Sequence, residues 1–245
     1  IINPSMRKYL EVSVAISKIA LRYIAPEDLH QYSVDEFFMD VTNSYHRFSS
    51  TVQSFCQKLQ FEIKEETGIN CSIGIGSNML LSKIAMDVEA KHTKSLIAEW
   101  RYQDVPKKLW PIQPLREFWG ISRKIEAKLN KRGIFTIGDL AHYPHQYLKR
   151  DLGVIGVDLH LHANGIDQSR VRDKYRVMNP SICKSQILMR DYRYEESKVV
   201  MRELIEDVAS RVRGRNQLAR TIHFSFGYSD EGGINKQYTL EEPTN

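Results

Sequence analysis

The sequence predicts an α+β protein built from more than one domain, and three features of its 245 residues support this. Segments with apolar residues at helical spacing are interleaved with short runs in which apolar and polar residues alternate. Prolines gather over residues 106–114, and residues 167–177 are polar and charged. Such breaks are typical of domain boundaries and linkers. We therefore expect a mixed first domain, a small helical domain, a linker and a second mixed domain.

The composition excludes several classes of protein. The chain has 35 Lys and Arg against 30 Asp and Glu, a net charge of +5, which fits a polyanionic partner without identifying one. Cys56, Cys71 and Cys183 lie far apart and form no zinc-type cluster. This favours reduced thiols and a cytoplasmic location. No apolar run approaches the roughly 20 residues of a membrane helix, so we expect no membrane span, and we see no signal peptide.

Two amphipathic helices are predicted in the first domain. The first begins at a Ser5 N-cap and carries apolar residues at helical spacing as far as Tyr23. It starts almost directly after Ile1, and we therefore expect the sequence to be a piece of a longer protein. The second covers residues 44–67, where apolar residues form one stripe and Gly68 supplies a C-cap. Such stripes favour packing in a core over contact with a cofactor.

Between these helices, residues 32–41 hold two adjacent carboxylates, Asp35 and Glu36, within apolar runs rich in β-formers. The pattern predicts two strands that meet at an acidic corner. Like charges held together beside apolar surface repel each other and lose hydration, which a divalent cation would relieve. Mg²⁺ takes oxygen ligands, commonly one or two carboxylates together with substrate phosphates. An ordinary exposed Asp-Glu turn is the alternative that the dipeptide alone leaves open.

A strand and a third helix follow the second helix. Residues 70–76 alternate between apolar and small residues, which predicts a half-buried strand that a backbone or a ligand can approach closely. Ser77 and Asn78 cap the next helix, and Lys83 lies about one turn into it. A helix N-terminus and a lysine together favour phosphate, although a solvated surface lysine is the alternative. Helix, hairpin, helix and strand make most of a ferredoxin-like αβ sandwich without its first strand.

Residues 115–165 predict short helices joined by tight glycine turns. Gly120, Ile121 and Ser122 precede a basic helix and resemble a helix-hairpin-helix, in which a glycine-bearing turn presents backbone N–H groups to a nucleic-acid phosphate. The usual turn is Gly-x-Gly, so Ser122 departs from it, and a plain capped helical turn is the alternative. Basic residues that would add counter-charge follow at once: Arg123, Lys124, Lys128, Lys131 and Arg132.

The last part of the sequence predicts a second mixed domain. We expect a strand over residues 181–189, a long helix over 195–212 and a strand over 221–228, in which apolar and polar residues alternate. Another strand is expected to begin in residues 236–240.

Basic residues in this domain offer a second candidate contact for a phosphate backbone. Lys184 and Ser185 would lie on a face of the first strand. Further cations fall near the ends of the predicted helix: Arg190, Arg193, Arg211, Arg213, Arg215 and Arg220. A basic solvated face is the alternative, and locally the favoured one.

Taken in order, these motifs resemble a Y-family translesion DNA polymerase of the bacterial UmuC/DinB-like kind, the ImpB/MucB/SamB family. The resemblance covers nearly the whole chain and depends on residues 32–36, 72–78 with 81–87, 119–140, and 181–185. The first two stretches are specific at their mutual spacing. The third occurs in many DNA-binding proteins, and the last is weak.

The resemblance implies both a fold and a function. The fold is an incomplete palm over residues 1–98, a helical thumb with the helix-hairpin-helix over 99–166, a linker over 167–177 and a partial little finger over 178–245. The function is template-directed DNA synthesis past damaged bases, a nucleotidyltransferase activity of DNA repair and the SOS response. Primer-template DNA and dNTPs would be the substrates, and a sliding clamp or accessory subunits would dock on regions outside this sequence.

The resemblance also implies roles for individual residues. Asp35 corresponds to a metal-binding aspartate, Glu36 to the neighbouring catalytic glutamate, and Lys83 to the lysine that meets the incoming triphosphate. Asp35 and Glu36 would bind Mg²⁺ in a two-metal site that clamps the attacking 3′-oxygen and the leaving pyrophosphate. Ser33 would be part of the motif scaffold, and Asp87 would be structural. DNA contacts are expected at Gly120, Ile121, Ser122, Arg123, Lys124, Lys184 and Ser185.

The sequence also departs from the family pattern. The first palm strand, with another metal-binding aspartate and an aromatic steric gate against ribonucleotides, is missing, and so are the fingers. His92 stands where a proline is common, and the little finger stops about halfway through its pattern. We therefore expect the intact protein to be a polymerase and this piece to be inactive alone. Two other functions remain open: a palm-type nucleotide cyclase, and a DNA-binding repair module without catalysis.

Overall fold

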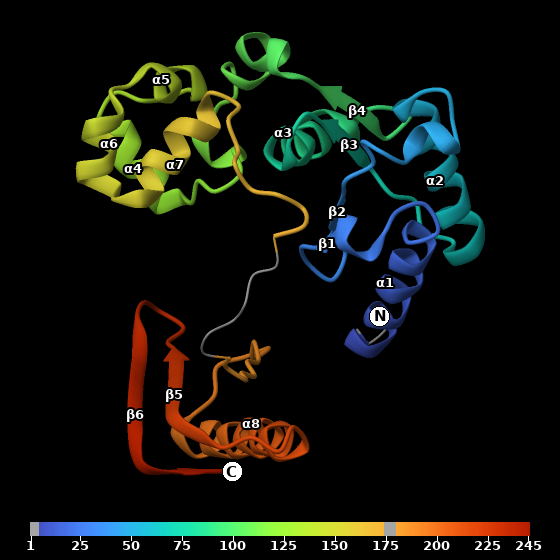
Figure 1. Cartoon of the computed structure of the whole chain (residues 1–245). Helices are drawn as coiled ribbons and strands as arrows, with labels where there is room; N and C mark the ends of the chain where they lie inside the picture. Colours follow the sequence, from blue (N-terminus) through green and yellow to red (C-terminus); the bar gives the residue numbers. More distant parts are fainter. Residues whose placement is uncertain (1–4, 174–179) are drawn as a thin grey trace. The chain divides into compact units, whose positions relative to one another are not determined.

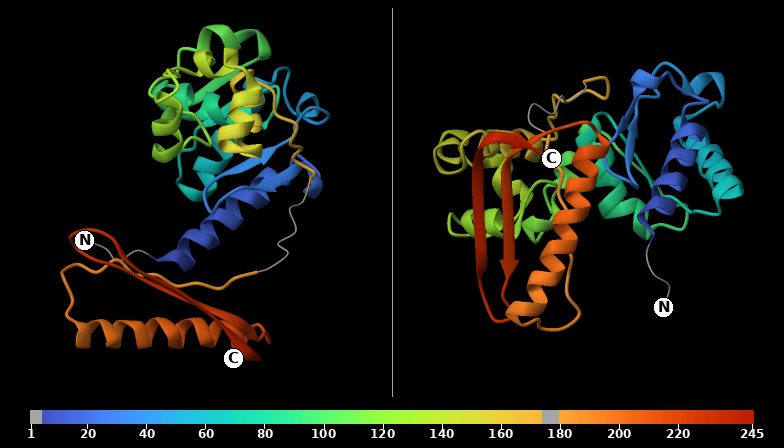
Figure 2. Two further views of the ribbon diagram at one scale, coloured as in Figure 1. Left: turned by 90° about the vertical axis from the view of Figure 1, so that its left-hand side faces the viewer. Right: turned by 90° about the horizontal axis from the view of Figure 1, so that it is seen from below.

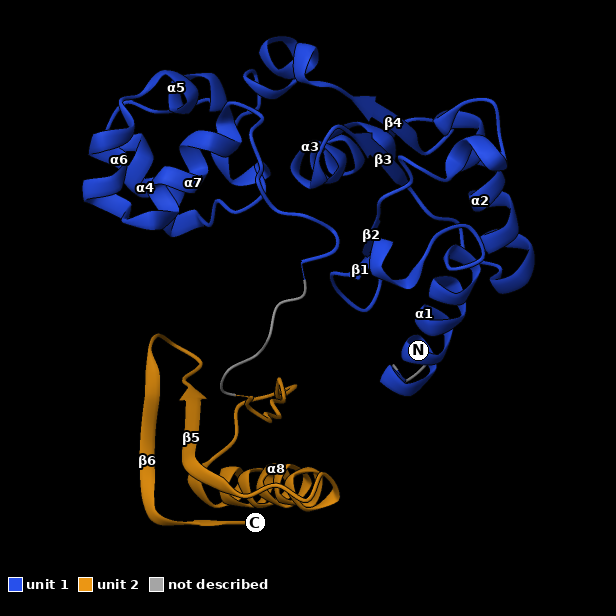
Figure 3. Ribbon diagram, in the orientation of Figure 1, with its two compact units in different colours: residues 1–175 blue, residues 176–245 orange. Residues whose placement is uncertain are grey.

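The computed structural model describes residues 5–173 and 180–245, which belong to two compact units divided after residue 175 (Figures 1 and 3). The first unit contains helices α1 to α7 and strands β1 to β4, and the second contains α8, β5 and β6. Of the predicted linker over residues 167–177, residues 174–177 lie outside the described part. Within that described part, no helix is both long and apolar enough to cross a bilayer.

Helix α1 (Met6–Ala20) begins where the sequence predicts. The side chain of Ser5 accepts the backbone N–H of Lys8 and so caps the helix. The first turns of α1 are exposed, whereas its C-terminal end is buried. This end packs against α2 (Val52–Thr67) in a core that both helices share.

The prediction of a helix over residues 44–67 is correct at its end and wrong at its start. Gly68 ends α2 in the left-handed conformation, with φ of 74°. The start is later than predicted because Thr51 and Ser54 form a reciprocal capping box, which satisfies the first free backbone groups there. Upstream of it, Tyr45–Arg47 form a separate 3₁₀ turn.

The acidic corner is a hairpin turn, as predicted. β1 (Leu29–Gln31) and β2 (Phe37–Met39) pair antiparallel, with the last residue of β1 opposite the first of β2. Residues 32–36 therefore form the turn. Phe38 is buried in the middle of β2, so the apolar run after the two carboxylates anchors the hairpin.

A second pair of strands lies in the same unit. β3 (Ile73–Gly76) pairs in parallel with β4 (Ile97–Trp100), which sequence analysis missed because four residues are too short to show a period. The order of elements is the predicted helix, hairpin, helix and strand, but the strands form two separate pairs.

Two glycines let α3 (Met79–Ile84) pack closely on β3. A Cβ on Gly74 would lie 2.0 Å from the carbonyl oxygen of Ser82, and one on Gly76 would lie 2.2 Å from the amide nitrogen of Ser82. The Ser82 hydroxyl donates to the Gly74 carbonyl at 2.8 Å. The small-residue face predicted over residues 70–76 is therefore filled by the backbone of the next helix.

The remainder of the first unit is helical, as predicted. Gly120 and Gly133 make the expected tight turns, with φ of 91° and 77°. One core joins this helical part to α3 and β4, through residues such as Leu80, Trp100 and Phe118. The palm-thumb boundary near residue 98 therefore stays a prediction. The helices are α4 (Arg123–Asn130), α5 (Ile137–His142), α6 (His145–Leu152) and α7 (Val154–Ala163).

The second unit consists of one long helix beside one hairpin (Figure 2). Helix α8 (Tyr194–Gly214) and the antiparallel strands β5 (Ala219–Gly227) and β6 (Gly233–Thr244) agree with the predicted helix and strands. The predicted strand over residues 181–189 is wrong, because this segment forms no strand. Two of its apolar side chains are almost fully exposed, Ile187 at 93% and Met189 at 97%. A strand also needs a neighbour for its backbone groups.

We predict that Gly76→Ala destabilises the first unit by about 3 kcal/mol, because the added methyl group overlaps the α3 backbone. Gly138→Ala is the matched control, since its Cβ would meet the Trp110 side chain at 3.1 Å and it lies in a helix. We expect it to change stability by less than about 1 kcal/mol. Urea unfolding followed by tryptophan fluorescence measures both, and equal effects would contradict the prediction.

Candidate active site

The hairpin turn holds Asp35 and Glu36 in a closed loop. The backbone N–H groups of Tyr32 and Ser33 both donate to the carbonyl oxygen of Glu36, each at 3.0 Å. The Ser33 hydroxyl donates to Asp35 Oδ1 at 2.7 Å. Asp35 is exposed and Glu36 is partly buried. The two side chains therefore belong to the same backbone loop, but that of Asp35 lies in solvent and that of Glu36 is partly covered.

Gln31, which sequence reasoning missed, ties this loop to α1. Its side-chain nitrogen donates to the Ser33 carbonyl at 2.6 Å and to the Glu36 carbonyl at 3.3 Å. Its side-chain oxygen accepts the hydroxyl of Ser17, on α1, at 3.0 Å. An amide carries donors and an acceptor, so one side chain holds the loop and the helix together. The sequence carried no clear signal for this role, because β1 is only three residues long and His30 in it is polar as well.

Lys83 reaches the acidic loop from α3. Its Nζ lies 2.7 Å from Glu36 Oε1 and 3.1 Å from Asp87 Oδ2, and its side chain is only 10% exposed. Directly after α3 the chain widens into a π-helical turn over Ala85–Glu89, which carries Asp87. The structure thus brings together Glu36 and Lys83, two of the residues that the sequence singled out, and adds Asp87 to them.

Lys83 belongs to a small network of paired charges. Asp87 Oδ1 also pairs with Lys91 Nζ at 2.6 Å. Two lysines are thus paired with two carboxylates, Glu36 and Asp87, and the local charges sum to 2 − 2 = 0. Burial by itself would lower the pKa of Lys83, but hydrogen bonds to Glu36 and Asp87 outweigh it and raise that pKa above its ordinary value. Lys83 is therefore charged at neutral pH.

The N-terminus of α3 is closed to phosphate. The side chain of Asn78 accepts the N–H of Leu81 at 2.8 Å, and Asp167 Oδ2 accepts the N–H of Leu80 at 3.1 Å. Both leucines are fully buried. The prediction that the N-terminus of this helix binds phosphate together with Lys83 is therefore wrong for the helix N-terminus. The lysine faces the acidic loop, while side chains already satisfy the helix end.

The glycine turn of the predicted helix-hairpin-helix lies against the acidic loop. Trp119, just before Gly120, donates its indole N–H to the hydroxyl oxygen of Tyr32 at 3.1 Å. The two rings meet edge to face, with centroids 5.7 Å apart. Phe38 lies beside both rings, at 5.8 Å from Tyr32 and 6.4 Å from Trp119. The acid pair, Lys83 and the glycine turn thus belong to one cluster.

Four of the five residues predicted to contact DNA at this turn are exposed: Gly120, Ser122, Arg123 and Lys124. Ser122 also caps α4, because its side chain accepts the N–H of Ile125. Ile121 differs, since its side chain is 5% exposed and its N–H donates to the Phe118 carbonyl at 3.1 Å. We correct its predicted role from DNA contact to core packing.

Lys184 and Ser185 belong to the second unit, and the strand predicted to present them does not form. Both residues are exposed. Lys184 Nζ lies 3.4 Å from Asp207 Oδ2 on α8. Arg211, also on α8, donates to the carbonyl of Cys183 at 3.4 Å. Contacts with the helix, rather than strand pairing, therefore hold this segment.

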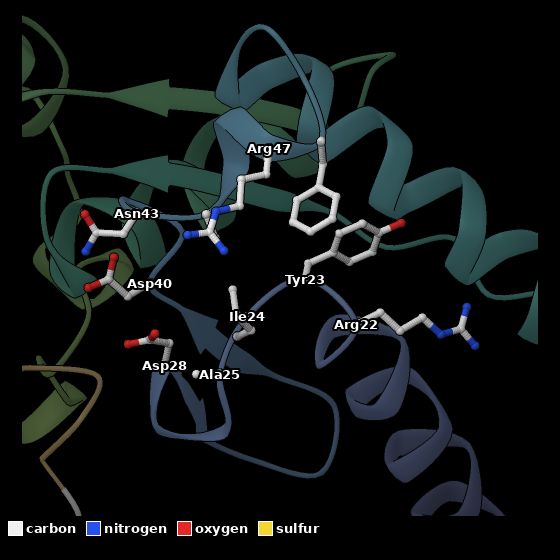
Figure 4. A pocket seen from close by; sticks show the side chains of 10 residues that line it. Arg22, Tyr23, Ile24, Ala25, Asp28, Asp40, Asn43 and Arg47 are labelled. Atoms are coloured by element: carbon white, nitrogen blue, oxygen red, sulfur yellow. The ribbon is translucent and has the colours of Figure 1, made fainter.

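An open pocket of about 360 Å³ lies at the other end of the hairpin strands (Figure 4). Asp28 and Asp40, which flank β1 and β2 opposite the turn, point into it, and Arg47 lines it. Arg172 binds the Asp28 carboxylate through two hydrogen bonds, at 2.6 and 3.1 Å. None of the predicted site residues lines this pocket.

The site combines an acidic hairpin turn, a buried lysine and a glycine turn. Comparison with known proteins identifies the family. Residues 1–87 match the impB/mucB/samB family, residues 179–245 match the C-terminal domain of that family, and residues 102–134 match the IMS family HHH motif. The chain belongs to the impB/mucB/samB family of Y-family translesion DNA polymerases.

Three relatives illustrate this membership. The chain is 42% identical over 248 residues to the UV-damage repair protein UvrX of Bacillus subtilis, covering all of this chain and 58% of UvrX. It is 46% identical over 191 residues to the DNA repair protein homolog YobH of the same organism, covering 76% of this chain and 88% of YobH. DNA polymerase IV of Pelotomaculum thermopropionicum is 37% identical over 244 residues, which are 99% of this chain and 59% of that protein.

A solved structure shares the fold. A Y-family DNA polymerase chimera superposes with a TM-score of 0.69 at 19% identity, covering 98% of this chain and 67% of the chimera. At this identity the likeness concerns the fold alone. The chain spans less than two thirds of the length of UvrX and of the DNA polymerase IV relative.

We predict that Lys83→Met destabilises the first unit by about 1–2 kcal/mol at neutral pH, because it leaves Glu36 and Asp87 without their shared cation. The folded-state pKa of Lys83 is raised, so its stabilisation is complete below the unfolded-state value of about 10.4. That stabilisation is lost as pH rises through the folded-state pKa. Urea unfolding should therefore show a constant difference from about pH 6 to pH 9, which shrinks above about pH 10.4.

Lys91→Met is the matched control, because Lys91 is half exposed and pairs with Asp87 alone. Its cost should stay near 0.5 kcal/mol, roughly that of a surface pair. A Lys83 effect that changes between about pH 6 and pH 8 would contradict the raised pKa.

Proposed function

We propose that the protein carrying this chain performs template-directed DNA synthesis past damaged bases, with the acidic turn as the metal-binding part of its active site. The observation that carries the proposal is the meeting of Glu36, Lys83 and the Tyr32–Trp119 contact in one cluster. Relatives of the chain bear the names DNA polymerase IV and UV-damage repair protein, which supports this reading over a nucleotide cyclase or a non-catalytic DNA-binding module.

The residues at the turn fit Mg²⁺ with substrate supplying the other ligands. Asp35 and Glu36 offer hard carboxylate oxygens, and Glu36 already holds a cation, the Lys83 ammonium. Within residues 5–173 and 180–245, no group of three His, Cys, Asp or Glu side chains forms a ready metal cage. One or two carboxylates plus substrate phosphates is the usual Mg²⁺ arrangement. When bound, the ions lower the pKa of the attacking 3′-hydroxyl and neutralise the leaving pyrophosphate.

The side chains of the turn have separable tasks in this proposal. Asp35 is exposed, and the Ser33 hydroxyl orients one of its oxygens, which leaves the other free to bind. Glu36 must release Lys83 in order to bind a metal ion. Lys83, freed from Glu36, turns its charge to the triphosphate oxygens and stabilises the charge that develops there. Its contact with Asp87 keeps it close to the turn.

The basic turn positions DNA in this proposal. Backbone N–H groups at Gly120 and at the start of α4 would bind a phosphate of the primer-template duplex, and Arg123 and Lys124 would add counter-charge. Lys184 and Ser185 would contribute from a little finger. We retain the proposed palm, thumb and little finger, a cytoplasmic location, and a sliding clamp or accessory subunits as partners. The family pattern has a further metal-binding aspartate that these 245 residues do not contain, and we retain the expectation that they are inactive alone.

We predict that Asp35→Asn in the intact protein reduces primer extension with Mg²⁺ and dNTPs by about 10²-fold or more, because transition-state charge loses its stabilisation. Glu36→Gln should have a similar effect. Asp40→Asn is the control, since Asp40 follows the other end of β2. It should leave extension within about twofold, as surface substitutions usually do. Clear extension by the 245-residue chain that Asp35→Asn leaves untouched would refute the proposal.

We further predict that Lys83→Met tightens Mn²⁺ binding to the chain by about three- to tenfold, the equivalent of one partly buried ion pair. The reason is that the Lys83 ammonium no longer competes for Glu36. Lys91→Met removes the same charge from Asp87 alone and should have a smaller effect. Electron paramagnetic resonance of free Mn²⁺ measures both, and weaker binding by the Lys83 variant would argue against a metal site at Glu36.

A further inference from the structure

Tyr32 touches every part of the candidate site. Its backbone N–H donates to the Glu36 carbonyl at 3.0 Å, which closes the acidic turn. Its hydroxyl oxygen accepts the Trp119 indole N–H at 3.1 Å. The Lys83 ammonium lies 6.0 Å from the centre of its ring. One residue therefore contacts the acid pair, the triphosphate lysine and the glycine turn.

The surroundings of Tyr32 are those of a surface contact between two loops, not of a buried core contact. Phe38 is buried and packs beside the Tyr32 and Trp119 rings, so it helps to hold them in position. Tyr32 itself is 45% exposed, and its bond with Trp119 is also exposed. Exposed hydrogen bonds contribute little to global stability but can decide between local conformations.

Trp119 directly precedes Gly120 in the sequence, so its backbone is part of the glycine turn. A phosphate bound at the turn would restrict the motion of Trp119. An immobilised indole would restrict the Tyr32 side chain, to which it donates a hydrogen bond. An immobilised Tyr32 would in turn favour the hydrogen bond from its backbone N–H to the Glu36 carbonyl. Coupling would require two states of the acidic turn, a closed one with these hydrogen bonds formed and an open one with them broken.

We propose that Tyr32 is a positioning residue that couples binding of a nucleic-acid backbone at the Gly120 turn to closure of the acidic turn. The inference rests on the proposed function, because it takes the Gly120 turn as the place where the duplex binds. Coupling of this kind is reciprocal, so a ligand that closes the acidic turn also favours the bound form of the glycine turn.

Hydrogen exchange at the amides of Tyr32 and Ser33 tests the proposal, because both amides report closure of the acidic turn. In the unsubstituted chain, adding a hairpin-capped DNA duplex should slow their exchange by about three- to tenfold, the equivalent of one hydrogen bond. Trp119→Phe and Tyr32→Phe keep the rings but remove the donor or the acceptor. Both variants should lose this protection while binding the duplex with affinity within about twofold.

Trp110→Phe is the matched control. Trp110 also donates its indole N–H to an oxygen, the Ala163 carbonyl at 3.1 Å, but it does not touch the acidic turn. It should keep the protection caused by DNA. Protection that persists in both test variants, or that disappears equally in the control, would overturn the coupling. Failure of the unsubstituted chain to bind the duplex would overturn the proposed DNA contact and the coupling with it, and the affinity measurement identifies this case separately.

Discussion

The ion pair between Lys83 and Glu36 is the interaction on which the site depends, and the fold is arranged so that it can form. Lys83 comes from α3, and its reach is sufficient only because α3 lies against β3. That approach requires Gly74 and Gly76, whose missing side chains make room for the helix backbone. Burying an ammonium group costs free energy unless carboxylates pair with it. The hairpin supplies the Glu36 carboxylate, and α3 supplies the Lys83 ammonium that pairs with it.

The site is also assembled from segments that lie far apart in the sequence. The acidic turn, the lysine helix and the glycine turn are separated by dozens of residues, yet side chains join them directly. These contacts hold the three parts together within the first unit. The acid pair keeps one carboxylate exposed and one paired with a cation, which suits the binding of a metal ion together with an anionic substrate.

Sequence patterns predicted local features well and long-range ones poorly. The acidic hairpin, the Ser5 cap and the Gly68 cap follow from neighbouring residues, and the structure agrees with them. The strand over residues 181–189 fails because a strand depends on a partner that its own sequence does not specify. The contact between Tyr32 and Trp119 joins residues 87 positions apart, so spacing carried no signal for it. The Asn78 cap of α3 was predicted, but the Asp167 cap was missed for the same reason, since Asp167 also lies 87 positions from Leu80.

The capping of α3 by Asp167 has a consequence for how such proteins can be recombined. Asp167 follows α7, its side chain is 5% exposed, and it accepts the Leu80 amide N–H at the start of α3. Asn78 likewise donates to the Gly165 carbonyl. A graft that takes residues 1–98 from one homologue and the following helices from another would thus separate a helix from its own cap. Natural or engineered crossovers should fall after Asp167.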